Sequence, residues 1–179
     1  KAALMNTAEV EIHEGSGAAR ITGQGAGRIA LAHAHDPGFL LSPPGLSFGQ
    51  VRAGAVISRT ITAQNVGASG IYSVTVESLS DTPGVTVTAS ISRWLASGIG
   101  EFAVYLEADS TAVPGEREGR IWLAQGERRL HVPWWVRVLP AGQSADILLL
   151  DDDASSLNGG RDYLSYYVRL LEDSGLTYT

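Results

Sequence analysis

The four histidines and the serines are the side chains of this 179-residue sequence that could support acyl transfer. A serine nucleophile needs a histidine base that is held in place by a carboxylate. None of the histidines (His13, His33, His35 and His131) lies near a Gly-x-Ser-x-Gly turn or has a suitable set of partners. The absence of cysteine also excludes thiolate nucleophiles, thiolate metal sites and disulfides. We therefore predict no catalytic residue in the sequence.

Three consecutive aspartates, Asp151, Asp152 and Asp153, follow the apolar run at residues 147–150. In α/β proteins, carboxylates in this position commonly bind magnesium or accept a phosphoryl group. The alternative is that Asp152 or Asp153 caps the following turn while the other carboxylates are solvated. Both interpretations remain open, and these three residues are the candidate metal ligands.

Two weaker motifs are more simply explained as structure. The segment His33-Ala-His-Asp36 would offer two imidazoles to a metal if it were an extended strand, but we favour a solvated helix end or loop before Pro37. The Gly-Gln-Gly-Ala-Gly sequence at residues 23–27 suggests dinucleotide binding. Its third glycine comes one residue early, and no buried strand precedes it. We predict a closing loop there and no cofactor.

Trp94, Trp122 and Trp135 could form a platform on which sugar rings stack, because exposed aromatic side chains offer flat apolar area. The alternative is burial against a neighbouring domain, and Trp135 is then the interface candidate. It lies in an alternating run that places Trp134 on the apolar face and Trp135 on the opposite face. The apolar face of this strand comprises Leu130, Val132, Trp134, Val136 and Val138, and the other comprises His131, Pro133, Trp135 and Arg137.

Short runs rich in Val, Ile, Thr and aromatic residues fill residues 45–140 and predict a mainly β fold, a β-sandwich of the immunoglobulin-like class. The prolines in Ser42-Pro-Pro-Gly45 place its start, with connecting structure over residues 1–44. Residues 141–179 change period and predict the first strand and helix of an α/β module, the helix running from about Arg161 to Asp173. We expect the natural chain to continue beyond residue 179. Two inward-facing sets are predicted: Tyr72, Val74 and Val76, and Phe102, Val104, Leu106 and Ala108.

The overall composition excludes two classes of partner. The net charge of −6 and the scattered arginines offer no basic surface for nucleic acid. No apolar run approaches the roughly 20 residues that a membrane-spanning helix requires. With 44% hydrophobic and 18% charged residues, the chain is expected to fold.

Several segments, in order along the chain, resemble parts of the subtilisin-like serine protease family. Residues 1–8, Lys-Ala-Ala-Leu-Met-Asn-Thr-Ala, resemble the end of the helix downstream of the catalytic serine. Residues 25–29 and the alanine-rich residues 30–35 resemble the segment that closes the catalytic domain and leads to a surface helix. Residues 46–49 and 59–67 resemble the opening strands of the fibronectin type III-like domain that follows it in many large secreted members.

This resemblance covers about residues 1–140 and implies a non-catalytic accessory region of a secreted serine endopeptidase. The family's catalytic serine, histidine and aspartate would lie upstream, so no residue here inherits a catalytic role. The implied partners are the protease domain itself and the protein substrates of the parent enzyme, and the implied location is extracellular or at the cell surface. Asp151–Asp153 more loosely resemble the start of a further module found in some long members. The alternative functions are a carbohydrate or cell-surface binding module, and metal or phosphoryl chemistry at Asp151–Asp153.

Overall fold

The computed structural model describes residues 1–10, 12–14, 17–80, 83–95, 98–140, 147 and 164–176. The chain divides into two compact units, Lys1–Ala141 and Gly142–Thr179. In the second unit the structure describes helix α4 (Leu164–Asp173), where a helix from about Arg161 to Asp173 was expected. Gly175 follows α4 with a φ of 68°, a conformation that favours glycine after a helix end.

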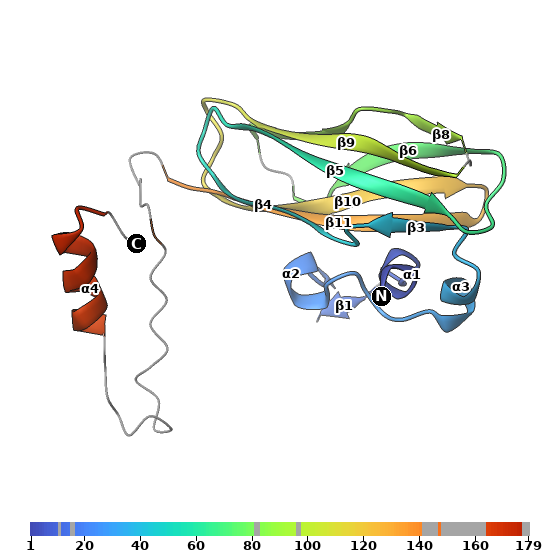
Figure 1. Ribbon diagram of the computed structural model, residues 1–179, viewed down its shortest axis with the longest axis horizontal. Coiled ribbons are helices and arrows are strands. Elements are labelled where there is room, and N and C mark those ends of the chain that lie inside the picture. Colours follow the sequence, from blue (N-terminus) through green and yellow to red (C-terminus); the bar gives the residue numbers. More distant parts are fainter. Residues whose placement is uncertain are drawn as a thin grey trace, which may run out of the picture. The chain divides into compact units, whose positions relative to one another are not determined.

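Two sheets form a β-sandwich in the first unit, which confirms the prediction of a mainly β fold (Figure 1). One sheet has the order β4 (Leu46–Val51), β11 (Arg128–Val138), β10 (Gly115–Gln125), β6 (Ile71–Ser78), β8 (Arg93–Leu95). The other has the order β3 (Phe39–Ser42), β5 (Val56–Asn65), β9 (Ile99–Ala108), β7 (Val85–Ala89). Strands β4 and β11 are parallel. The other neighbouring strands of the two sheets are antiparallel.

Alternating apolar side chains from both sheets fill the core, as the two-residue period predicts. All five apolar residues of β11 are buried, and Trp134 is only 2% exposed. The inward residues of β9 are buried as well, whereas Tyr105 and Glu107 on its other face are exposed. The largest fully buried side chains include Tyr72, Phe39, Phe48, Leu41, Ile61, Leu106, Ile121, Leu123 and Leu130.

The sandwich also includes a strand upstream of residue 45, where we expected it to begin. Strand β3 pairs with β5 in register, and its Phe39 and Leu41 are fully buried in the core. Phe39 packs edge-on against Tyr72 with ring centroids 5.0 Å apart. A run of four residues directly before two prolines is too short for sequence periodicity to identify as a strand.

The amino-terminal segment forms a further layer on the outer side of β11 (Figure 1). It contains α1 (Ala2–Asn6), the hairpin of β1 (His13–Glu14) and β2 (Gly17–Ala18), α2 (Ile21–Gln24) and α3 (Leu31–His35). Glu9 and Arg28 form a two-way backbone bridge within it, with N···O distances of 2.8 and 2.9 Å. A Cβ atom at Gly27 would overlap the carbonyl oxygen of Glu9, so this close approach requires glycine.

Candidate functional site: a pocket beside the amino-terminal segment

Asn6 joins the amino-terminal segment to both sheets of the sandwich. Its side chain is fully buried; Nδ2 donates to the carbonyl of His131 on β11 at 3.2 Å, and Oδ1 accepts from the amide of Leu41 on β3 at 2.9 Å. Leu41 lies on β3, at the edge of its sheet, and His131 lies before the residues of β11 that pair with β4. A buried backbone group without a hydrogen-bond partner is costly. The Asn6 amide supplies such a partner to one backbone group in each sheet.

His131 lies beneath this layer and is 1% exposed, although the alternation of β11 points it away from the core. Its Nε2 lies 2.9 Å from the carbonyl oxygen of Ala26, which can only accept, so Nε2 carries the proton and Nδ1 is the acceptor of the neutral ring. Burial lowers the pKa of His131 to about 4. The imidazole is therefore neutral at physiological pH.

A pocket of about 590 Å³ lies between the amino-terminal segment and the β10–β11 hairpin. The cross-strand pair Trp122 and His131 contributes to its lining, with ring centroids 5.1 Å apart. The indole Nε1 of Trp122 donates to Glu77 Oε2 at 2.8 Å, and the Arg129 guanidinium lies 5.7 Å from the Trp122 ring centroid. These contacts fix the orientation of the indole ring.

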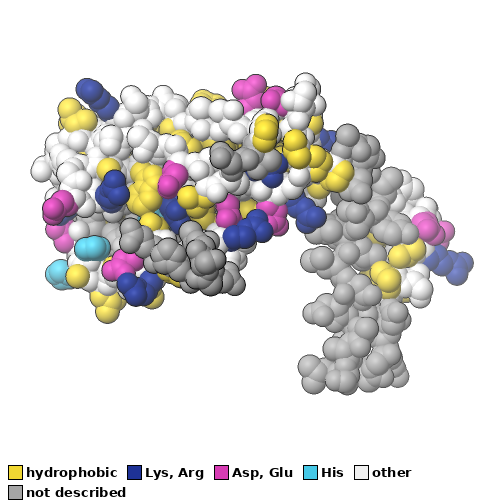
Figure 2. All heavy atoms as spheres, turned by 180° about the vertical axis from the view of Figure 1, so that it is seen from behind, with side chains coloured by type: hydrophobic (Ala, Val, Ile, Leu, Met, Phe, Trp, Pro, Cys, Tyr) yellow, Lys and Arg dark blue, Asp and Glu magenta, His cyan; other side chains and the backbone are white. Residues whose placement is uncertain are grey.

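Two carboxylate–guanidinium pairs also line the pocket. Arg28 donates through Nε and Nη2 to Glu9 Oε2, and this bonding lowers the pKa of the Glu9 carboxyl. Arg128 Nη2 donates to Asp36 Oδ2 at 2.7 Å across 92 residues of sequence. On the face shown in Figure 2, basic and acidic side chains are interspersed, without a large patch of either sign on the described surface.

The three tryptophans that could have formed a sugar platform do not share one surface. Trp94 pairs with the inward-facing Tyr72 and packs against the core, with its ring centroid 5.7 Å from that of Phe102. Trp122 on β10 and Trp135 on β11 belong to the same five-stranded sheet as Trp94, but their side chains lie on its outer face. Trp122 alone of the three lines the pocket described above.

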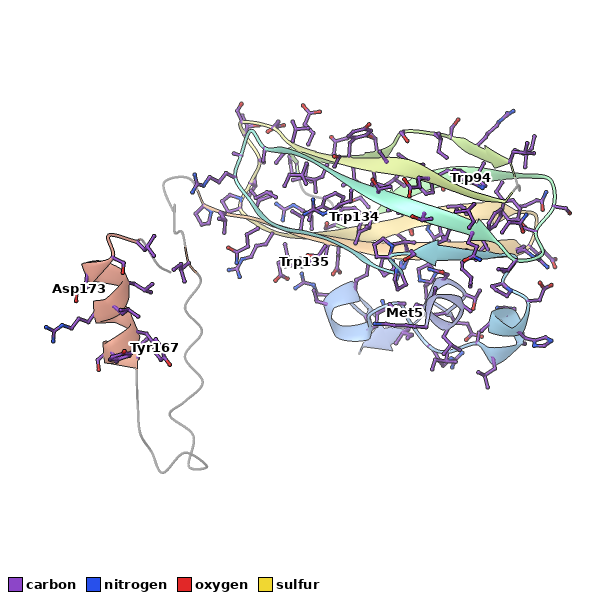
Figure 3. All side chains as sticks on the ribbon, viewed as in Figure 1. Met5, Trp94, Trp134, Trp135, Tyr167 and Asp173 are labelled. Carbon is purple, nitrogen blue, oxygen red and sulfur yellow. The ribbon has the colours of Figure 1, made fainter. Side chains whose placement is uncertain are left out.

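Trp135 points away from the core, toward α2, whereas Trp134 lies between the sheets (Figure 3). It is half-buried and sits opposite Glu118 of β10. The indole Nε1 of Trp135 and one carboxylate oxygen of Glu118 are buried without a hydrogen-bond partner in the described part of the chain. Whether Trp135 contacts a further domain stays a prediction.

The remaining predicted sites do not assemble into a reactive centre within the described residues. His33 and His35 lie on helix α3, where residues two apart point about 200° apart around the axis, so they do not share a face as they would on a strand. Residues 23–27 form the end of α2 and a turn with positive φ at Gly25 and Gly27, as expected for a closing loop. Asp151–Asp153 lie outside the described residues. Among the residues described, no group of three or more His, Asp or Glu side chains could hold a metal ion.

None of the helices in the described ranges is long and apolar enough to cross a membrane. The residues that line the pocket were not predicted as a group from sequence. They come from segments about a hundred positions apart. The sequence singles out Trp122, His33, Asp36 and His131 separately, but nothing in it indicates that they meet.

No protein-family model matches the chain, and no curated protein matches it. Distant structural similarity is found to a family 123 glycoside hydrolase from Clostridium perfringens, at 12% identity and a TM-score of 0.39, over 55% of this chain and 24% of that one. The secreted serine protease VesC from Vibrio cholerae matches at 12% identity and a TM-score of 0.41, over 57% of this chain and 25% of that one. The PapD-like domain of human CEP192 matches at 10% identity and a TM-score of 0.42, over 59% of this chain and 87% of that one. The chain spans about a quarter of the length of the first two, and similarity this distant concerns the fold alone.

Proposed function

We propose that this chain is a non-catalytic accessory region of a secreted, subtilisin-like serine endopeptidase, and that its sandwich supports the protease domain through the amino-terminal segment. The observation that carries the proposal is the position of Asn6. It belongs to the Asn-Thr-Ala sequence that resembles the end of a helix of the catalytic domain, and its side chain is bonded to both sheets. A catalytic domain that includes this helix would be held firmly against the sandwich.

The outer side of the amino-terminal segment favours the same arrangement. Leu4, Ile29 and Leu31 are 37%, 60% and 73% exposed, while other residues of the segment are buried against the sandwich. We take these exposed apolar side chains as the candidate docking surface, because apolar patches commonly mark interaction sites. The body of a protease domain is the partner that the resemblance implies for this surface.

The first test is the coding sequence upstream of Lys1. A serine in a Gly-Thr-Ser context shortly upstream supports the proposal, and an upstream region without subtilisin-like catalytic segments overturns it. The present chain itself is expected to show no casein hydrolysis and no labelling by a serine-directed fluorophosphonate. Stoichiometric labelling of any serine would show that the chain carries its own nucleophile.

The second test uses the full-length enzyme and measures its thermal inactivation. Ile29→Ser and Leu31→Ser are expected to accelerate inactivation, because they remove apolar contacts between the segment and the protease domain. Val113→Ser is the matched control, since Val113 is 47% exposed in the loop between β9 and β10. Equal inactivation rates for the wild type and all three variants would contradict docking through this surface.

A further inference from the structure

The pocket beside Trp122 has the properties of a ligand site that the accessory role does not require. Its volume of about 590 Å³ lies in the range of roughly 300 to 1,000 Å³ typical of small-molecule sites. It combines one fixed aromatic ring with several polar groups, as such sites commonly do. We propose that this pocket binds a neutral, polyhydroxylated sugar unit of an oligosaccharide. The inference is independent of whether the parent protein is a protease.

The charges in the pocket argue for a neutral ligand. Equal numbers of guanidinium and carboxylate groups line it: Arg28, Arg128 and Arg129, against Glu9, Asp36 and Glu127. Two of the three guanidinium groups are already bonded to carboxylates of the lining. A phosphate or polyanionic ligand would need uncompensated positive charge, and a cation would need converging carboxylates. The lining offers neither.

The hydrogen-bonding groups that remain suit hydroxyl groups, which both donate and accept. Each ion pair uses one carboxylate oxygen, Oε2 of Glu9 and Oδ2 of Asp36. Glu9 Oε1 and Asp36 Oδ1 have no hydrogen-bond partner within the described part of the chain, so both can accept from a ligand.

Trp122 supplies the apolar surface that a sugar ring needs. Aromatic side chains combine flat apolar area with a polar edge. Here the polar edge is bonded to Glu77, and His131 and Arg129, both on β11, contact the ring. Its orientation is therefore set before a ligand binds, which reduces the entropy lost on binding.

The experiment is isothermal titration of the whole chain with neutral oligosaccharides, namely cello-, malto-, xylo-, chito- and manno-hexaoses, and with a high-mannose glycopeptide. Binding of one or more of these sugars is expected. Tighter binding of the free hexaoses than of the glycopeptide would indicate that the natural ligand is a polysaccharide. Tighter binding of the glycopeptide would indicate a glycoprotein ligand. Polygalacturonate and inorganic phosphate are the anionic probes. Failure of every neutral sugar to bind at about 5 mM, which corresponds to less than about 3 kcal/mol of binding free energy, overturns the proposal. So does binding of only the anionic probes.

Variants locate the site. Trp122→Leu is expected to weaken binding about tenfold or more, a change of at least about 1.4 kcal/mol. Asp36→Ala is the second variant; its side chain is 63% exposed, so the fold survives, and an affinity loss of several-fold is expected. The control is Tyr105→Ala, because Tyr105 is 44% exposed on β9 of the other sheet, and its affinity should equal that of the wild type. Sugar binding that is unchanged in both pocket variants places the site elsewhere and overturns the assignment.

Discussion

Replacing Asn6 by alanine removes the side chain that connects α1 to the two sheets. The amide of Leu41 and the carbonyl of His131 would both lose their bonding partner in a region where Asn6 is fully buried. An orphaned buried polar group costs about 1–3 kcal/mol, so two cost about 2–6 kcal/mol. Water entering the space left by the amide recovers part of this, and we expect a loss of about 2–4 kcal/mol in the free energy of unfolding.

Urea unfolding followed by tryptophan fluorescence measures this loss. All four tryptophans lie in the unit Lys1–Ala141, so the signal reports on the sandwich and not on the second unit. With a slope of about 1–3 kcal/mol/M, the midpoint should fall by about 1 M or more. Thr7→Val is the control, because the Thr7 hydroxyl donates to the nearby carbonyl of Ala3, within the same helical turn. A midpoint for Asn6→Ala that matches the control would refute the idea that Asn6 connects the sheets.

Three further predictions concern the sandwich. Trp134→Ala should cost about 3–5 kcal/mol and Trp135→Ala much less, and equal shifts of the urea midpoint would contradict the register of β11. Gly119→Ala should lower the urea midpoint strongly, because the added Cβ overlaps the Glu77 carbonyl oxygen and the Trp134 ring. At Gly23 an added Cβ meets no atom within 4 Å, so Gly23→Ala should be neutral or stabilising. The pKa of His131 is lowered to about 4 in the folded protein, so as the pH falls the unfolded chain becomes protonated at this ring before the folded protein does. The free energy of unfolding should therefore fall by about 3 kcal/mol between about pH 6.5 and about pH 4. His131→Gln should remove this loss in urea titrations at pH 6.5 and 5, and an unchanged pH dependence would show that other groups cause it.

The alternation of apolar residues predicted the sandwich and the inward side of β11, because side chains on successive strand residues point to opposite faces. It could not predict what covers the outer side. His131 is buried there by a segment more than a hundred residues away in sequence, and Asn6 gives no sign of that contact in its own neighbourhood.

Strand β10 shows a second limit of sequence patterns. Its Arg117, Glu118 and Arg120 are 4–6% exposed, yet charged residues in a strand usually indicate a solvated face. Arg120 Nη1 lies 3.8 Å from Glu77 Oε2, and Glu118 Oε1 lies 3.7 Å from Arg20 Nε. Arg120 and Glu118 therefore each have an oppositely charged neighbour from another part of the chain. Such pairs depend on the tertiary fold and cannot be found by reading one strand.

The contacts that close the sandwich join residues far apart in the chain. Leu46 of β4 pairs with Trp134 of β11, and Asn6 reaches across 125 residues to His131. During synthesis, β4 therefore cannot pair within its sheet until β11 has been made. At about 5–20 residues per second, the ribosome needs about 4–17 s to proceed from residue 51 to residue 138. Over that interval the apolar side chains of β4 have no partner strand, and the yield of folded protein depends on how well the emerging chain is kept from aggregating.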